Sequence, residues 1–468
     1  HTRYGVALMP KHDPTMRAPV GTTQKVANYI KSVASQDLPD EVASKTKCHL
    51  LDTLAAVISG AHLKAGRLVT GFIETQGGTP EATVWGTDIR TTAINAALAN
   101  GISGHADETD DSHLEGRFHP GCAVVPAALA VGEARSASGK AVLNAVVAGY
   151  DIGARFSMAL GVSGPRTATH STHSLGALFG ASAAASSLMG FDSQKAASAL
   201  SYTIQQASGI PYWERDSEHV EKAFDFGGMG ARNGVAAAIM VGAGLTGVQD
   251  PLEGKLNYLS AFAENPDADV LTAGLGTRFE IMEASIKKWC VGSPIQAALD
   301  ATVALLDQGL DVADIEKIDL IMPDDRLPIV DNRDMPDVCL QHMVAVTLLD
   351  GGASFVTSHD NARMCDPAVL DLREKMTVIP SHELTIAQPA RQAILEIGTK
   401  SGVTFRHHTK VVYGTPGNPM SPEDVQANAL ELISSVLGSK LSNALADAVW
   451  NLEKIKDINA LAAIVKGE

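Results

Sequence analysis

Helical periodicity runs through almost every segment up to about residue 270. Apolar residues recur at three- and four-residue spacing, the repeat of one face of an α-helix. These segments span residues 23–60, 91–104, 123–135, 139–161, 174–190, 193–208 and 230–243. Glycines at their ends suit helix C-caps, and the abundant Ala and Gly within them allow close approach of backbones. The pattern predicts a large domain of closely packed helices.

The pattern changes after residue 271. Segments 315–322, 376–379, 393–399 and 403–413 are rich in β-branched residues and are separated by Gly, Pro and Asp. Helical periodicity returns at Pro422, with Ser421 as the expected N-cap. Since 468 residues exceed what one core usually serves, we expect a mainly α fold of two domains. A discontinuous helical domain would take residues 15–275 and 415–468, and a smaller α/β domain residues 276–414.

Charge and cysteine content narrow the class of protein. A formal charge of −16 argues against a general binder of nucleic acid or anionic membranes. The five cysteines are odd in number and form no CxxC pair, which favours reduced thiols and a cytoplasmic protein. The uncharged stretch 174–191 consists largely of Ala, Gly and Ser, so we expect a buried helix and no membrane span.

The densest polar segment lies between two Ala-rich helical stretches, at residues 105–120. It contains His105, His113 and His119 together with a run of Asp and Glu. Carboxylates and imidazoles together suit divalent metal ligation, and they equally suit general acid–base chemistry. A loop whose Asp side chains cap helices is the plainer alternative. The segment has no HxxxH spacing and is too rich in Asp for a typical zinc site, so the sequence predicts no metal site.

Three further segments combine polar side chains with helix starts or turns. His170 and His173 precede the Ala/Gly/Ser helix, where free N–H groups could receive a carboxylate, although capping by a serine explains part of this pattern. Lys222 opens a glycine-rich turn that lacks the spacing of a nucleotide site. Lys287 and Lys288 precede Trp289 near the change of pattern, where a cleft between domains is expected.

In this order, the four segments resemble the motifs of the MmgE/PrpD family, which includes 2-methylcitrate dehydratases, cis-aconitate decarboxylases and iminodisuccinate epimerases. The acidic motif is similar to residues 108–112 with His119-Pro120, and the HxTxxLG motif to residues 170–176. The lysine-containing turn resembles residues 222–234, and the entry to the second domain resembles residues 287–290. Residues 332–337 also look like a family feature. The resemblance covers essentially the whole chain.

The resemblance implies a helical domain with an α/β lid, an active site between them, a homodimer and no cofactor. It implies a lyase that dehydrates or decarboxylates a citrate- or aconitate-type acid by proton abstraction next to a carboxylate. The catalytic residues carried over are Glu108, His119, His170, Lys222 and Lys287. The substrate-binding residues carried over are Asp110, Asp111, Ser112, His113, Lys288 and Arg333.

We expect His119 to act as the general acid–base, tuned by the neighbouring carboxylates, while His170 and the lysines hold substrate carboxylates. Ser293-Pro294 replaces the HxP that the family has downstream, so substrates other than methylcitrate and cis-aconitate stay open. The alternatives are an epimerase or isomerase of a dicarboxylate in the same fold, a metal-dependent hydrolase using the Asp/His-rich loop, and a non-catalytic helical dimer.

Overall fold

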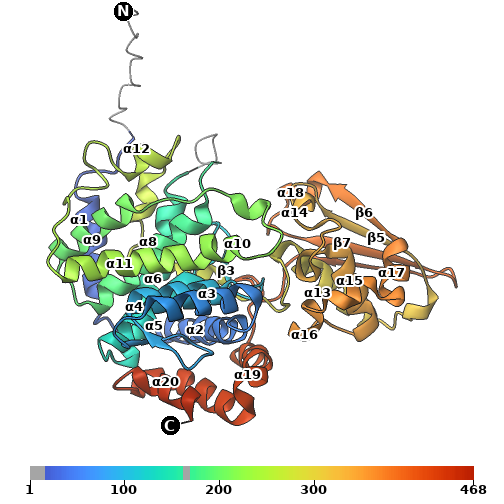
Figure 1. Cartoon of the computed structure of the whole chain (residues 1–468). Coiled ribbons are helices and arrows are strands. Elements are labelled where there is room, and N and C mark those ends of the chain that lie inside the picture. Colours follow the sequence, from blue (N-terminus) through green and yellow to red (C-terminus); the bar gives the residue numbers. More distant parts are fainter. Residues whose placement is uncertain (1–15, 162–168, 468) are drawn as a thin grey trace, which may run out of the picture.

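Closely packed helices make up the larger part of the computed structural model, which describes residues 16–161 and 169–467 (Figure 1). The prediction of a mainly α fold is confirmed; residue 15, the predicted domain start, lies outside the described part. The N-terminal helices are α1 (Thr22–Val33), α2 (Asp40–Gly60), α3 (Lys64–Gln76), α4 (Ala93–Gly104), α5 (Gly121–Ala134), α6 (Gly139–Met158), α8 (Thr172–Leu188), α9 (Ser193–Gln205), α10 (Glu221–Ala223), α11 (Met229–Gly242) and α12 (Tyr258–Phe262).

Helix α8 occupies the centre of this helical part. It packs against α5, α6, α9 and α11, and every residue from Ser174 to Ser187 is buried. The Ser171 side chain accepts a hydrogen bond from the Ser174 N–H and so caps the helix. Helix α8 is therefore the buried helix that the stretch 174–191 predicts. Among the described residues, no helix is both long and apolar enough to cross a membrane.

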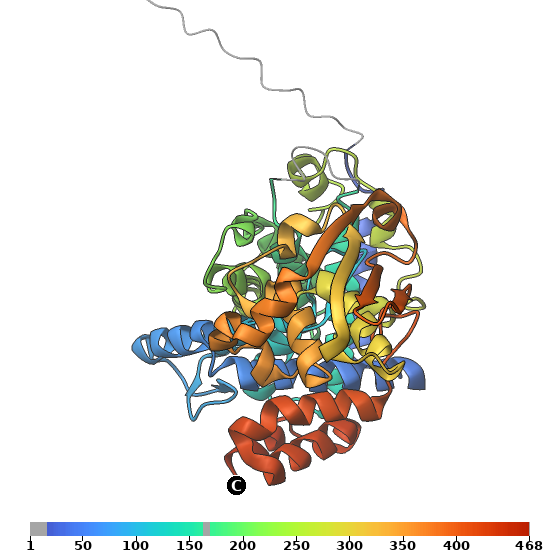
Figure 2. The same ribbon diagram turned by 90° about the vertical axis from the view of Figure 1, so that its right-hand side faces the viewer.

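The C-terminal helices return to the helical part. They are α19 (Pro422–Trp450), which breaks at Gly438, and α20 (Asn459–Lys466). Helix α19 packs against α2 and starts as predicted, with Ser421 as its N-cap and Pro422 in its first turn. Figures 1 and 2 show both helices in red at the edge of the helical body, beside segments more than 350 residues earlier in the chain.

A four-stranded mixed sheet forms the centre of the α/β part. Its order is β6-β5-β7-β8; β5 and β6 are parallel, and the other neighbouring pairs are antiparallel. The strands are β5 (Ile315–Pro323), β6 (Met376–Ser381), β7 (Ala393–Thr399) and β8 (Thr404–Thr409), and the helices are α13 (Gln296–Asp307), α14 (Leu327–Val330), α15 (Leu340–Asp350), α16 (Phe355–Ser358), α17 (Pro367–Glu374) and α18 (His382–Ile386). Alternate residues of β7 are buried, where α13 packs against it.

The hydrophobic side chains form two large clusters. One takes members from residues 18–284 and 429–462, and the other from residues 291–412. The chain passes from the first to the second near Ile286 and returns near Gly414, where the Ile286 N–H donates to the Gly414 carbonyl at 3.0 Å. These clusters support a division close to the predicted one, with the helical cluster extending to Ala284. The domain boundaries at 275/276 and 414/415 stay predictions.

Four two-residue strands lie outside the main sheet. They are β1 (Ala82–Thr83), β2 (Arg90–Thr91), β3 (Ser112–His113) and β4 (Ala284–Ser285), which pair as β1-β2 and β3-β4. The β3-β4 pair joins the acidic segment to the stretch that enters the α/β part. It therefore brings two of the four sequence motifs side by side.

Close backbone contact positions the helix that precedes the acidic segment. A Cβ placed on Gly60, at the end of α2, would lie 1.9 Å from the Ser103 carbonyl oxygen of α4. A Cβ on Gly227 would lie 2.1 Å from the Gly101 carbonyl oxygen of the same helix. Only hydrogen fits at these points. Helix α4 is therefore fixed on two sides one turn before His105.

We predict that Gly60→Ala lowers the free energy of unfolding by about 1–3 kcal/mol, the usual cost of forcing a methyl group into a packed interior. Gly71→Ala is the matched control, because Gly71 is exposed in helix α3 and nothing lies within 4 Å of a Cβ placed there. The control should be neutral or slightly stabilising, since Ala favours helix over Gly. Urea unfolding followed by circular dichroism measures both. Equal stabilities of the two variants would contradict the close approach of α2 and α4.

Candidate active site

The acidic segment between α4 and α5 is buried over its first nine residues. Every residue from His105 to His113 is less than one-tenth exposed. A solvated run of charge is therefore excluded, because buried carboxylates must be paired or hydrogen-bonded. The partners come from three sides: the helical part, the segment following β4, and the α/β part.

Asp110 is the carboxylate on which two histidines converge. It accepts from His105 Nδ1 at 2.9 Å and from His119 Nδ1 at 3.1 Å, and Lys287 Nζ lies 3.8 Å away. Burial alone would raise the pKa of Asp110, but the charges and hydrogen bonds of His105 and His119 hold it well below its usual range. Asp110 is thus ionised, and as a carboxylate it can only accept hydrogen bonds. Both histidines therefore carry a proton on Nδ1.

His119 has the geometry of a general base. With Nδ1–H donated to Asp110, its Nε2 carries the lone pair, and the residue lines the main cavity of the molecule. Burial lowers the pKa of His119 to about 4, with Lys287 and His105 acting in the same direction and Asp110 opposing them. The ring is neutral near pH 7. It can therefore accept a proton there.

Glu108 lies between two lysines. Lys222 Nζ forms an ion pair with Oε1, Lys287 Nζ lies 3.7 Å from Oε2, and Lys287 also donates to the Glu108 backbone carbonyl at 2.7 Å. Burial would raise the pKa of Glu108, but Lys222 and Lys287 outweigh it and hold the pKa well below its usual value. Lys287 contacts both Glu108 and Asp110, so a single ammonium group compensates two buried carboxylates.

Asp111 anchors the segment to the helical part. It accepts from His49 Nδ1 of α2 at 2.6 Å, from the Tyr150 hydroxyl of α6, and from the Gly121 N–H at the start of α5 at 2.8 Å. Three helices thus hold one carboxylate. Asp111 does not line the cavity; it fixes the backbone that carries Asp110 next to it.

The main cavity has a volume of about 800 Å³ and is lined by residues of both parts of the fold. The lining residues of the helical part are Ser112, His113, Leu114, Arg117, Phe118, His119, His170, Ser171, Thr172, His173, Pro211, Trp213, Glu214, Asp216 and Lys222. Those of the α/β part are Asp325, Arg326, Pro328, Ile329, Arg333, Met335, Val338 and Arg391. Five of the lining residues are permanently cationic: Arg117, Lys222, Arg326, Arg333 and Arg391. Such a lining suits an anion with more than one charged end.

The second histidine motif borders the cavity from the start of α8. His170 is half-buried, with its ring edge-on to Phe262 at 5.0 Å. His173 stacks on Phe226 with ring centroids 3.8 Å apart, and burial holds its pKa well below the usual value. Phe226 belongs to a π-helical turn, Phe224–Gly228, which packs against α4. The glycine-rich turn after Lys222 therefore supplies the aromatic ring on which His173 stacks.

All predicted site residues except Lys288 fall into two groups. Ser112, His113, His119, His170, Lys222 and Arg333 line the cavity. Glu108, Asp110, Asp111 and Lys287 lie beneath it as a buried charge network. The roles predicted for these residues are not decided by their positions and stay predictions.

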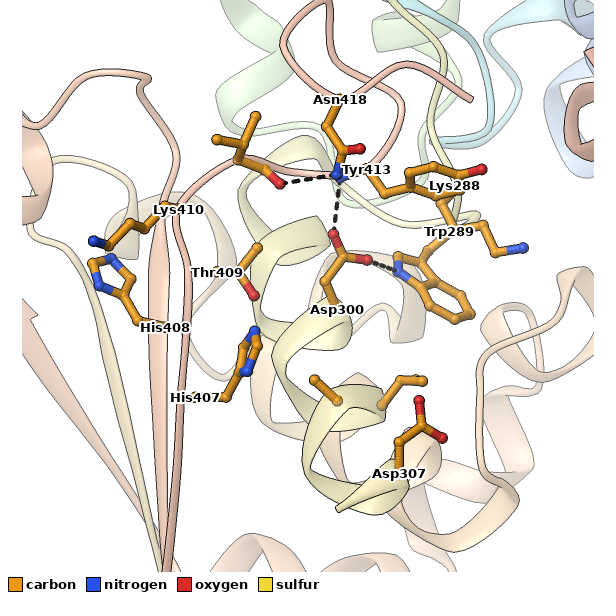
Figure 3. Close-up of a pocket in the computed structure, with 13 residues that line it drawn as sticks. Lys288, Trp289, Asp300, Asp307, His407, His408, Thr409, Lys410, Tyr413 and Asn418 are labelled. Carbon is orange, nitrogen blue, oxygen red and sulfur yellow. Dashed lines mark hydrogen bonds between the residues drawn. The ribbon is translucent and has the colours of Figure 1, made fainter. Parts of the chain in front are cut away.

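Lys288 lies apart from the main cavity. It lines a second, open hollow of about 450 Å³ beside α13 and β8, with its ammonium group 5.6 Å from the centre of the Trp289 ring (Figure 3). In this hollow Asp300 accepts from Trp289 Nε1 at 2.9 Å and from the Tyr413 N–H at 3.0 Å. Lys288 thus does not line the main cavity, although it borders a small third pocket together with Lys287.

The sequence predicted no role for several residues that the structure places at the site. They are His49, His105, Tyr150, His173, Trp213, His219, Arg326 and Arg391. For His359 the sequence left open whether it lines the lid or is structural. His105 and His173 stand inside the quoted motifs, so their presence was visible but their contacts were not. Arg391 stands alone in a turn between α18 and β7, and no motif marks it.

Among the described residues, two groups of side chains have the spacing of metal ligands: His105 with Asp110 and His119, and His105 with Glu108 and His219. In the first group, hydrogen bonds already direct both Nδ1 atoms at Asp110. In the second, Glu108 contacts two ammonium groups, whose charge repels a cation. The contacts of both groups thus favour a hydrogen-bonded network over a metal centre.

Comparisons with known proteins cover both parts of the chain. Residues 24–271 match the model of the MmgE/PrpD N-terminal domain, and residues 289–454 that of the MmgE/PrpD C-terminal domain. The chain is 25% identical to cis-aconitate decarboxylase of Homo sapiens, over 95% of this chain and 94% of the relative. It is 24% identical to cis-aconitate decarboxylase of Aspergillus terreus, over 98% of each.

An ion pair joins the acidic segment to the α/β part. His359 Nε2, beyond α16, lies 3.0 Å from Asp107 Oδ2. Burial lowers the pKa of His359, but the interactions with Asp107 outweigh it and raise the pKa to about 9. Because the folded-state pKa lies above the unfolded value of 6.5, the stabilisation is complete below pH 6.5 and is lost as pH rises through 9.

We therefore predict that unfolding free energy falls between pH 6.5 and 9 and that His359→Gln removes this part of the pH dependence. Urea unfolding at several pH values measures it. His62→Gln is a suitable control, because His62 is an exposed residue of the helical part that contacts only a backbone carbonyl, Gly86 O at 3.1 Å. An unchanged pH slope in His359→Gln would contradict the stabilising role of the pair.

Proposed function

Because the chain belongs to the MmgE/PrpD family, we propose that it is a lyase that dehydrates or decarboxylates a small di- or tricarboxylate without a cofactor. One observation carries the proposal: a neutral histidine, His119, lines the cavity while Asp110 holds its Nδ1–H. This arrangement offers one basic nitrogen in a fixed direction, which is the requirement for proton transfer at carbon.

The charge of the cavity lining supports a polycarboxylate substrate. Lys222 and Arg117 approach it from the helical part, and Arg333 from the α/β part. Fixed cations of this kind stabilise the negative charge that develops when a bond next to a carboxylate breaks, and they act most strongly in a site screened from water. His170 and Ser112 line the same cavity and complete the binding surface.

Dehydration and decarboxylation place the same demand on the site. In dehydration, a base takes the proton from the carbon next to a carboxylate, and the hydroxyl group leaves after taking up a proton. In decarboxylation, the electron pair of the broken C–C bond stays on the substrate as CO₂ leaves, and the carbon takes up a proton. We assign the proton transfer to His119. A bound carboxylate raises the pKa of a nearby histidine, so the same ring can accept or deliver a proton.

The buried network has a supporting role in this proposal. Asp110 fixes the tautomer of His119, while Glu108 and Lys287 set the local charge. Lys222 pairs with Glu108 and lines the cavity, so it can exchange part of this ion pair for a substrate carboxylate. The names of the relatives make decarboxylation of an aconitate-type acid the first reaction to test. An epimerase would use the same proton transfer and is the second candidate.

We predict that His119→Gln lowers kcat by roughly 10²- to 10⁴-fold, the usual contribution of general acid–base catalysis. The absorbance of the conjugated alkene reports the rate with citrate- and aconitate-type acids. His382→Gln is the matched control, because His382 is exposed and pairs only with Asp324 at the surface of the α/β part. A His119 variant as fast as the control would rule out His119 as the proton-transfer residue.

Chelation separates this proposal from a metal-dependent reaction. After treatment with a strong chelator and removal of the metal complex, we expect the turnover of the wild-type protein to be unchanged. Activity that disappears on chelation and returns with a divalent metal would sink the cofactor-independent mechanism. It would instead support ligation by His105 with Glu108 and His219. Elemental analysis of the same samples gives an independent measurement.

A further inference from the structure

We propose that Arg391 is a substrate-binding residue, presented by the α/β part, that holds one carboxylate of the di- or tricarboxylate. This inference rests on the proposed function, since it concerns the substrate of the same cavity. Arg391 lies in the turn between α18 and β7 and lines the cavity. It stands outside the sequence motifs of the helical part.

Arg391 differs from the other cavity arginines of the α/β part in having no partner. Arg326 pairs with Asp325 at 3.1 Å, and Arg333 donates to the Ile329 carbonyl at 2.9 Å. Within residues 16–161 and 169–467, the buried Nε of Arg391 has no hydrogen-bond partner, and no carboxylate lies within ion-pair distance of its guanidinium. The residue as a whole stays partly exposed, but a buried N–H without an acceptor is unfavourable, and the described part of the chain supplies none for this Nε.

The backbone at Arg391 is held in a conformation that L-residues rarely adopt. Its φ is 65°, in the left-handed region, where a bulky side chain is strained. The turn is fixed by Gln392, whose side-chain amide donates to the Pro389 carbonyl at 2.8 Å and whose side-chain oxygen lies 2.8 Å from His408 Nε2. The strain is thus maintained by the surrounding contacts, and it places the guanidinium at the cavity.

The charges around Arg391 also favour an anionic ligand. Burial lowers the pKa of Arg391 to about 10, with Arg326 acting in the same direction. It is still protonated at neutral pH. A carboxylate bound there would relieve both the burial and the repulsion, and a planar guanidinium can bind a carboxylate through two hydrogen bonds.

Lys222 and His119 lie on the helical side of the cavity, and Arg391 lies on the α/β side. A ligand that contacts both sides needs at least two acidic groups. We therefore assign the cavity to acids with separated carboxylates, and we expect monocarboxylates to be poor ligands. We assign Lys222 of the helical part and Arg391 of the α/β part to the two ends of such a ligand.

Arg391→Gly provides the sharpest test, because glycine relieves the positive φ while removing the charge. A residue with only a structural role would lose stability on this change. A ligand-binding residue at a strained position should instead leave the melting temperature no lower than that of the wild type. Arg391→Lys is the conservative variant, which keeps the charge but loses the two-pronged geometry.

Binding is measured by isothermal titration calorimetry with tricarballylate, a tricarboxylate that lacks the hydroxyl group and the double bond. We expect Arg391→Gly to weaken binding by roughly 10- to 100-fold and Arg391→Lys to recover part of it. Arg406→Gln is the control. Arg406 is an exposed arginine of strand β8 in the α/β part, and it lies 3.4 Å from Glu396. With a substrate that turns over, the Arg391 variants should raise KM more than they lower kcat.

The outcomes separate this inference from the proposed function. If Arg391→Gly binds tricarballylate as tightly as the control, the role of Arg391 is overturned, while turnover by the wild type would keep the lyase proposal intact. If the wild type binds tricarballylate through Arg391 but converts no citrate- or aconitate-type acid, the inference stands and the lyase proposal fails. If the wild type does not bind tricarballylate, the role of Arg391 is overturned, and turnover of citrate- and aconitate-type acids decides the lyase proposal separately.

Discussion

Compensation of charge inside the acidic segment is the constraint on which the site depends. Asp110 and Glu108 are removed from water, and each would be unstable there without histidine or lysine neighbours. Lys287 contacts both and comes from the segment that leads into the α/β part. The fold of the helical part, the direction of His119 and the position of the second part are thus linked through one ammonium group.

Small side chains make this burial possible. The close approach at Gly60 and Gly227 fixes α4, and the acidic segment starts directly after that helix. The composition and periodicity of the helical stretches predicted such packing, because the small side chains of Ala and Gly allow helix backbones to approach closely. The start of α19 at Ser421 and Pro422 was also predictable, since an N-cap and a first-turn proline act locally. Local capping rules do not explain the start of every helix. Helix α2 begins at Asp40 with Pro39 in the N-cap position, and no side chain caps it.

Contacts between distant residues set the limit of prediction for the site. The pairing of Asp107 with His359 joins positions far apart in the sequence, and no local pattern encodes it. Lys287 and Lys288 are neighbours in sequence, but the ammonium group of Lys287 contacts Glu108 and Asp110, whereas that of Lys288 lies by the Trp289 ring. Arg391 belongs to no recognised sequence motif. Its positive φ could not be predicted either, because arginine has no preference for that conformation. Local chemistry was therefore predictable, whereas its three-dimensional partners were not.

The hydrogen bond between Ile286 and Gly414 closes the base of the α/β part, so the segment between them enters and leaves the helical body at one point. A segment whose two ends meet can be exchanged or remodelled as a unit during evolution without threading through the rest of the chain. His119 and Asp110 would stay in place during such a change. A change of this kind would alter the part of the cavity lining that includes Arg333 and Arg391 while leaving in place the histidine to which we assign proton transfer.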